Sequence, residues 1–385
     1  MKFRCRYLLT AAALIAACLL LAACGGEEKE EAAAPAEAAP AEPGVPMFRG
    51  NPAHTGENPG PGVERSPTLL WRFDAGGHVS SSPAVVGGVL YVGSADGHVY
   101  ALDAGTGEER WRFKTGIGII SSAAVVDGVV YIGSYDNRLY AIDAATGEEL
   151  WHFETGDMIY SSPAVASGRV YVGSFDNSVY ALDADTGQEL WRFQTGFSVD
   201  SSPAVVEGVV YIGSIDEYVY ALDAATGEER WRFQTGSGVE SCPALVGGVA
   251  YIGSSDSYVY ALDTSTGEER WRFKTGRLVD SCPAAVGGAV YVGARDNHVY
   301  GLDAATGREL WRFETGDMIL SSPAVTGGVV YIGSWDNNLY ALDAATGKEL
   351  WRFQTRRGIR SSPAVVDGVV YVGSTDGYVY AITEG

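Results

Sequence analysis

A repeat of 40 residues constrains the fold of this chain more than any other feature of its sequence. Eight tryptophans follow one another at intervals of 40 residues, and only Trp335 falls outside the series. The series consists of Trp71, Trp111, Trp151, Trp191, Trp231, Trp271, Trp311 and Trp351. Within each unit, short runs rich in Val, Ile, Tyr and Phe are separated by turns that contain Gly and Asp. The pattern predicts eight sheets of four short antiparallel strands.

The polarity of the runs predicts how these sheets are arranged. Inner runs such as 129–132 are apolar at successive positions, so both of their faces must be covered. Sheets stacked face to face around an axis achieve this, which predicts an all-β, eight-bladed β-propeller over residues 66–385. The last unit ends before its Trp strand. We therefore expect the early strand 68–73 to complete the eighth blade and close the ring.

The charge of the chain excludes one large class of partner. It has 48 Asp and Glu against 27 Lys and Arg, which gives a formal net charge of -21. Such a surface repels phosphate, so we expect no nucleic-acid partner. The five histidines have neither the spacing of a metal site nor that of a triad with serine.

The first residues have the character of a processing signal. Residues 1–23 combine a basic start with an apolar run, and residues 21–24 read Leu-Ala-Ala-Cys. This tetrapeptide resembles the lipobox of bacterial lipoproteins, which implies cleavage before Cys24 and acylation of that cysteine as a membrane anchor. The alternative is an ordinary secretory signal. Because Gly25 is not Asp, the resemblance implies the outer membrane, facing the periplasm, in a Gram-negative cell, and otherwise the outer face of the cytoplasmic membrane.

Two further segments precede the repeats. Residues 24–46 are rich in Ala, Pro and Glu and cannot build a core, so we expect an extended acidic tether. Residues 47–65 form a lead-in segment before the propeller.

A short motif between units carries a family resemblance. Residues 141–151 read Ala-Ile-Asp-Ala-Ala-Thr-Gly-Glu-Glu-Leu-Trp, and the motif recurs around the chain. It resembles the tryptophan-docking motif of the pyrroloquinoline-quinone (PQQ) repeat propellers. The expected roles are structural: Asp143 and Thr146 close a turn, Gly147 takes the left-handed conformation, and the series of tryptophans packs between blades.

Differences between the units are concentrated in two loops that alternating strand direction places on one face of the ring. One variable residue precedes each Ser-Ser or Ser-Cys pair, and the other precedes each turn Asp. Aromatic and aliphatic residues there are candidates for binding a partner protein, with the aromatic turn tips expected to be exposed. These candidates are Ile120, Tyr135, Tyr160, Phe175, Ile215, Leu320 and Trp335.

The same loops also contain an acidic arc. Asp200, Glu240 and Asp280 occupy equivalent positions in three consecutive units, and Arg295 and Arg360 flank them. The arc could be a solvated loop series, a cation site or a site for a basic peptide, and which metal it would hold is unknown.

Two cysteines of the repeats stand where the other units have serine. Cys242 and Cys282 occupy equivalent positions in adjacent units. Export to an oxidising compartment would permit a disulfide, but its strict geometry leaves the pairing open.

The combination of lipobox, spacer and eight PQQ-type units is similar to the BamB family of outer-membrane assembly lipoproteins. That resemblance implies a lipid-anchored, non-catalytic scaffold that binds envelope proteins, including the outer-membrane barrel assembly machinery. An alternative hypothesis is an enzyme similar to the quinoprotein dehydrogenases of the wider family. Those enzymes have long insertions, adjacent cysteines and calcium ligands. This chain lacks insertions and adjacent cysteines, so we expect neither PQQ nor calcium and no enzyme activity. A second alternative is a periplasmic ligand-sensing or substrate-binding propeller.

Overall fold

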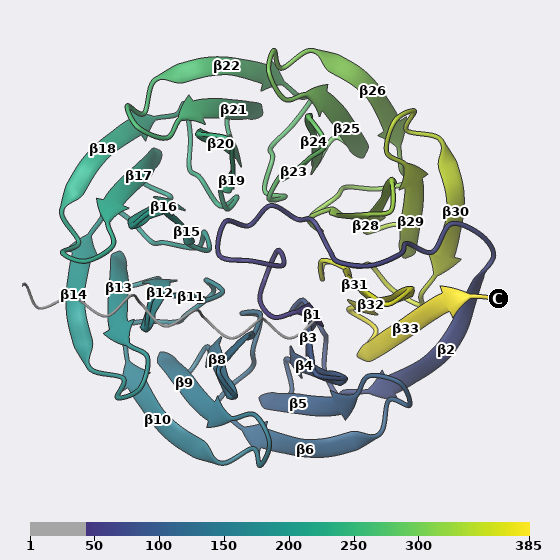
Figure 1. Ribbon diagram of the computed structural model, residues 1–385, viewed down its shortest axis with the longest axis horizontal. Coiled ribbons are helices and arrows are strands. Elements are labelled where there is room, and N and C mark those ends of the chain that lie inside the picture. The colour runs from purple at the N-terminus through teal and green to yellow at the C-terminus, as the bar shows by residue number, and fades with distance from the viewer. Residues whose placement is uncertain (1–43) are drawn as a thin grey trace, which may run out of the picture. The chain divides into compact units, whose positions relative to one another are not determined.

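The described part of the molecule is a ring of eight antiparallel sheets around a central channel (Figure 1). The structure is a computed structural model and describes residues 44–385. The expected leader, Cys24 and residues 24–43 of the expected tether lie outside the described residues. The eight-bladed, all-β propeller predicted from the repeat is confirmed. Nowhere in residues 44–385 is there a helix long and apolar enough to cross a bilayer.

Each blade runs from an innermost strand at the channel to an outermost strand at the rim. Blades one to four comprise β3 (Ala84–Val86), β4 (Val89–Gly93), β5 (His98–Asp103) and β6 (Glu109–Lys114); β7 (Ala124–Val126), β8 (Val129–Gly133), β9 (Arg138–Asp143) and β10 (Glu149–Glu154); β11 (Ala164–Ala166), β12 (Arg169–Ser174), β13 (Ser178–Asp183) and β14 (Glu189–Gln194); and β15 (Ala204–Val206), β16 (Val209–Gly213), β17 (Tyr218–Asp223) and β18 (Glu229–Gln234). Blades five to eight comprise β19 (Ala244–Val246), β20 (Val249–Gly253), β21 (Tyr258–Asp263) and β22 (Glu269–Lys274); β23 (Ala284–Val286), β24 (Ala289–Gly293), β25 (His298–Asp303) and β26 (Glu309–Glu314); β27 (Ala324–Thr326), β28 (Val329–Gly333), β29 (Asn338–Asp343) and β30 (Glu349–Gln354); and β31 (Ala364–Val366), β32 (Val369–Gly373), β33 (Tyr378–Glu384) and β2 (Pro67–Asp74).

The eighth blade closes the ring as predicted. Strand β2 pairs antiparallel with β33, with Pro67 opposite Glu384 and Phe73 opposite Val379. The two ends of the propeller therefore share one sheet, and no blade is left without its outer strand.

The docking motif joins each blade to the next. The indole N–H of Trp111 donates to the carbonyl of Ala144 over 2.9 Å. Asp143 Oδ1 accepts from the backbone N–H of Thr146 over 2.7 Å and closes the turn. Gly147 has φ +76°, and a Cβ on it would lie 2.7 Å from the Trp111 ring. A side chain at this position would separate the tryptophan from its turn.

The hydrophobic core lies between neighbouring blades rather than in one central mass. One cluster joins Tyr171 of blade three to Val210 and Ile212 of blade four. Because every blade repeats this contact on both faces, the apolar runs of the sequence are covered on both sides.

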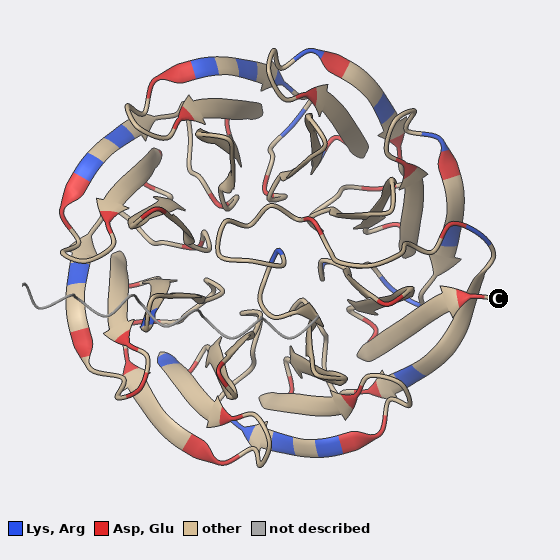
Figure 2. Cartoon of the chain, in the orientation of Figure 1, with Lys and Arg blue, Asp and Glu red and all other residues tan. Residues whose placement is uncertain are grey.

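Most of the outermost strands carry both acidic and basic residues (Figure 2). On β6, for example, Arg112 Nε lies 3.6 Å from Glu109 Oε1. Exposed pairs of this kind add little stability, but charged side chains protect an open strand edge from pairing with other sheets.

The lead-in segment closes one end of the channel. Strand β1 (Gly44–Val45) pairs with β3, so residues 44–46 of the expected tether belong to the described ring. The reason is a backbone contact: these residues add a short strand to the inner edge of blade one. Beyond it, the segment follows the inner strands, accepting hydrogen bonds from Val205 N–H at Pro52 and from Leu245 N–H at Ala53.

Candidate functional site

A cavity opens at the other end of the channel, among the loops that differ between units. Its outer part has a volume of about 250 Å³. It is lined by Tyr160, Phe175, Asp200, Glu240, Asp280, Arg295, Leu320 and Arg360. A deeper part of about 110 Å³ is lined by seven serines together with residues of the outer part, and it reaches Phe48 of the lead-in segment. We call this blind cavity the channel mouth.

The loops that carry the mouth residues are pinned to their own blades. Glu240 lies between β18 and β19, in a loop where Thr235 Oγ1 donates to the carbonyls of Glu217 (2.9 Å) and Ser237 (2.6 Å). The turn residue Asp256 accepts from Gly236 N–H over 2.7 Å. These local bonds fix the backbone, so Glu240 is presented at a defined place on the channel wall.

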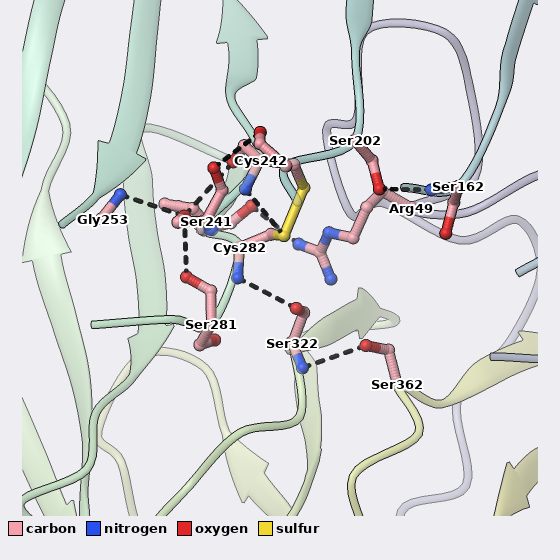
Figure 3. Close-up of a disulfide and its surroundings, with 12 residues drawn as sticks. Arg49, Ser162, Ser202, Ser241, Cys242, Gly253, Ser281, Cys282, Ser322 and Ser362 are labelled. Carbon is pink, nitrogen blue, oxygen red and sulfur yellow. Dashed lines mark hydrogen bonds between the residues drawn. A yellow bond between two sulfur atoms is a disulfide. The ribbon is translucent and has the colours of Figure 1, made fainter. Parts of the chain in front are cut away.

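An incomplete ring of seven hydrogen bonds, open between Ser202 and Cys242, surrounds the deeper part of the mouth, and Figure 3 shows the part near the disulfide. In each of its links, the backbone N–H of one blade donates to the side chain at the equivalent position of the next blade. The links run Ser82 to Ser122 (2.9 Å), Ser122 to Ser162 (3.0 Å), Ser162 to Ser202 (2.9 Å), Cys242 to Cys282 (3.0 Å), Cys282 to Ser322 (2.9 Å), Ser322 to Ser362 (3.0 Å) and Ser362 to Ser82 (2.9 Å). We call this ring the serine belt. It satisfies backbone donors that would otherwise be buried without partners.

The pairing that the sequence leaves open is present in the belt. Cys242 and Cys282 form a disulfide between blades five and six, with their Cα atoms 4.9 Å apart (Figure 3). Innermost strands approach more closely than blades do at the rim, so equivalent positions there fall within disulfide reach.

The acidic arc lies on one wall of the mouth. Arg295 Nε donates to Asp280 Oδ2 over 2.5 Å, and the Asp280 side chain is only 9% exposed. Burial raises the pKa of Asp200 to about 6. Burial, reinforced by the charges of Asp280 and Asp200, raises the pKa of Glu240 to about 7. Two buried carboxylate oxygens, Asp200 Oδ1 and Asp280 Oδ1, have no hydrogen-bond partner within residues 44–385.

The wall beside Asp200, on blades two and three, is aromatic. The ring centroid of Tyr160 lies 5.0 Å from that of Tyr135 and 5.1 Å from that of Phe175. The guanidinium of Arg360 reaches over the Tyr160 ring at 5.6 Å from its centroid. Because Arg360 precedes blade eight and Tyr160 precedes blade three, this contact crosses the mouth.

The expectation of exposed aromatic tips is wrong for two of the three residues. Tyr135 and Phe175 are half-buried because both pack against Tyr160, and Trp335 alone is exposed, at 37%. The three aliphatic candidates are also half-buried: Ile120 and Leu320 line the mouth, and Ile215 packs against the loop at Gly238.

Two further apolar residues are exposed on the variable loops and are not among the predicted candidates. Ile117 is 58% exposed and Phe197 is 57% exposed. Both occupy the first position after the Thr-Gly of their unit, where the other units have Gly, Asp, Ser or Arg. The signal that could have identified them is a large apolar residue at an otherwise polar or small loop position.

Comparison with known proteins agrees with this architecture. Three solved structures share the fold. BamB from Moraxella catarrhalis is 21% identical with a TM-score of 0.73, over 83% of this chain and 100% of that one. Quinohemoprotein alcohol dehydrogenase from Comamonas testosteroni is 20% identical with a TM-score of 0.75, over 88% of this chain and 80% of that one. The computationally designed Ika8 protein is 21% identical with a TM-score of 0.73, over 81% and 98%.

The sequence itself gives a more specific match. No curated protein matches it. The family described as outer membrane protein assembly factor BamB matches residues 64–121, 115–216, 215–322 and 295–385, which together span the whole propeller. The chain therefore belongs to the BamB family.

Proposed function

We propose that this protein is a non-catalytic scaffold of the cell envelope, which binds partner proteins through the loops around the channel mouth and acts in outer-membrane protein assembly. Membership of the BamB family supports the assignment. The observation that carries it is the asymmetry of the ring. Ile117, Phe197 and Trp335 are exposed on the variable loops, whereas the other end is closed by the lead-in segment. Exposed apolar side chains gathered on one face are typical of protein interfaces.

The likeness to a quinohemoprotein makes an enzyme the second candidate, but the mouth residues do not fit a quinone held with calcium. Calcium takes six to eight oxygen ligands. Asp280 is instead paired with Arg295, and residues 44–385 contain no group of three His, Cys, Asp or Glu side chains placed to hold a metal. The cysteines bond across blades and are not neighbours in the chain. We therefore propose that the protein uses neither cofactor. Dye-linked alcohol oxidation, or a quinone absorbance band after addition of PQQ and calcium, would contradict this.

We also propose that a lipid anchor at Cys24 holds the protein on the outer membrane, facing the periplasm, if the cell is Gram-negative. Metabolic labelling with a palmitate analogue should mark the wild-type chain and not the Cys24→Ala variant. Equal labelling of the two would exclude this anchor.

Crosslinked capture from membranes tests the scaffold role. Recovery of barrel-assembly proteins is expected from the wild type, and the triple change Ile117→Ala, Phe197→Ala and Trp335→Ala should reduce it at least tenfold. Leu150→Ala with Leu190→Ala is the matched control, because these leucines are exposed on the outer strands β10 and β14. Capture that survives the triple change, or that the control abolishes, would exclude the loop face as the interface.

A further inference from the structure

The channel mouth holds more negative charge than its own ion pair neutralises. Arg295 pairs with one oxygen of Asp280 and leaves the other, Oδ1, buried without a partner. Asp200 Oδ1 is also buried and unpartnered. Glu240 lies between these two residues in the arc and lines the same cavity. Buried carboxylate oxygens without donors are costly, and a donor supplied from outside would relieve that cost.

We propose that the channel mouth binds the positively charged end of an arginine or lysine side chain presented by a partner protein. This inference rests on the proposed function, because it takes the guest to be part of a protein. It adds the chemistry of the contact: a cation against Asp200 and Glu240, with its stem along the aromatic wall.

The protein already places one guanidinium against the aromatic wall of this cavity. Arg360 lies over the Tyr160 ring at 5.6 Å, in a geometry that attracts a cation to the face of the ring. Tyr160 in turn stacks with Phe175, so the wall continues beyond the area that Arg360 covers. Arg360 lowers the pKa of both Asp200 and Glu240, yet the pKa of each remains raised. Arg360 therefore shows that this wall accepts a guanidinium, and it forms no ion pair with either Asp200 or Glu240.

The shape of the cavity favours a side chain over a metal ion. The mouth is blind because the lead-in segment, with Phe48 on the cavity wall, fills the channel behind it. A ligand can enter only from the loop face. If the cation belongs to a side chain of a partner protein, the rest of that protein stays outside the cavity, beside Ile117 and Phe197. Two carboxylates without an ion pair suit a single organic cation and are too few for the ligand shell of calcium.

The titration of Glu240 should be coupled to binding. The charged groups that face it are Asp200, Asp280, Arg295 and Arg360, and the phenol of Tyr160 lines the same cavity. A cationic guest favours the carboxylate form, so binding near neutral pH should release a proton and weaken as the pH falls from 7.5 to 5.5.

The test is calorimetric titration of the full chain with acetyl-Leu-Arg-Leu-amide, using the same peptide with citrulline as the matched neutral probe. We expect the arginine peptide to bind at least tenfold more tightly than the citrulline peptide. Glu240→Gln and Asp200→Asn should each weaken binding about tenfold. Arg360→Gln should strengthen it severalfold, because it removes the competing guanidinium. Glu314→Gln on the outer strand β26 is the control and should change nothing. Thermal melts establish that each variant is folded.

The outcomes separate this inference from the scaffold role. Equal binding of the two peptides, or binding that ignores Glu240→Gln and Arg360→Gln, overturns the cation site even if membrane capture succeeds. Binding of spermidine but not of the arginine peptide reassigns the mouth to small amines and also overturns it. Arginine-specific binding together with failed membrane capture would support the site and reject the assembly role.

Discussion

The indole N–H of Trp351 donates a hydrogen bond of 2.8 Å to the carbonyl of Val63. In the other blades the equivalent indole donates to the residue after the motif Asp, as Trp111 does to Ala144. The eighth blade has no such turn, because its two outer strands, β33 and β2, come from opposite ends of the propeller. Val63 supplies the missing acceptor, and the Tyr331 hydroxyl donates to the same carbonyl over 2.9 Å.

Removal of the lead-in segment should therefore destabilise the ring. A chain that begins at Glu64 loses both hydrogen bonds to the Val63 carbonyl, each worth about 1 kcal/mol, together with the burial of Val63. We expect the free energy of unfolding to fall by at least about 3 kcal/mol in denaturant titrations. A chain that begins at Gly44 is the control and should match the full chain. Equal unfolding free energies of the full chain, the chain from Gly44 and the chain from Glu64 would contradict the stabilising role of Val63.

The two kinds of tryptophan should respond differently to truncation. Trp311 is 8% exposed and docks on the next blade, so Trp311→Ala should cost about 3–5 kcal/mol of unfolding free energy. Trp335→Ala removes an exposed side chain and should change stability by about 0.5 kcal/mol or less. Denaturant titration measures the unfolding free energy of both variants. Similar losses of unfolding free energy from Trp311→Ala and Trp335→Ala would show that docking on the next blade does not stabilise the fold.

Breaking the disulfide should lower stability, and serine should recover part of the loss. The bond closes a loop of 40 residues, which corresponds to about 4 kcal/mol of loop entropy in the unfolded chain. Replacing Cys242 and Cys282 by Ser should cost less than replacing both by Ala, by about 1 kcal/mol for each belt hydrogen bond restored. Thiol titration of the unfolded chain 44–385 should find no free cysteine before reduction and two after it. Free thiols before reduction would exclude the bond.

Replacing Glu240 should change how stability depends on pH. The folded pKa of about 7 exceeds the ordinary value of 4.5, so the folded chain binds this proton more tightly than the unfolded chain does. Glu240 therefore weakens the fold progressively as the pH rises from about 4.5 to 7, and the loss is complete above that range. Glu240→Gln should be more stable than the wild type by about 2 kcal/mol at pH 8, with partial solvent screening allowed for, and nearly equal at pH 4. A stability difference that does not vary with pH would contradict the raised pKa.

The sequence predicts those features of the fold that depend on residues repeated in every unit. The eight blades, the pairing of β2 with β33 and the turn at Asp143 follow from recurring apolar runs and turn residues. The path of the lead-in segment cannot be predicted in this way, because inner-strand N–H groups donate to its backbone carbonyls, such as that of Pro52. Almost any sequence can make such bonds.

The candidate site was predicted in outline only. The loops that vary identify the end of the channel where the cavity opens, but they do not reveal that Tyr160 and Leu320 line the cavity while Trp335 is exposed to solvent. That difference depends on the width of the channel at its mouth. The same distance decides whether Arg360 can reach Tyr160, two residues that are 200 positions apart in the chain and on different blades.

The serine belt has an electrical consequence. Each of its N–H groups points toward the blade that follows, so the bond dipoles circulate around the axis and largely cancel across it. Unlike the dipoles of parallel helices around a pore, which add along the axis, the dipoles of the belt therefore contribute little field along the channel. Charge substitutions in the loops, such as those at Asp200 or Arg360, should therefore change the potential that an approaching molecule meets without altering the belt.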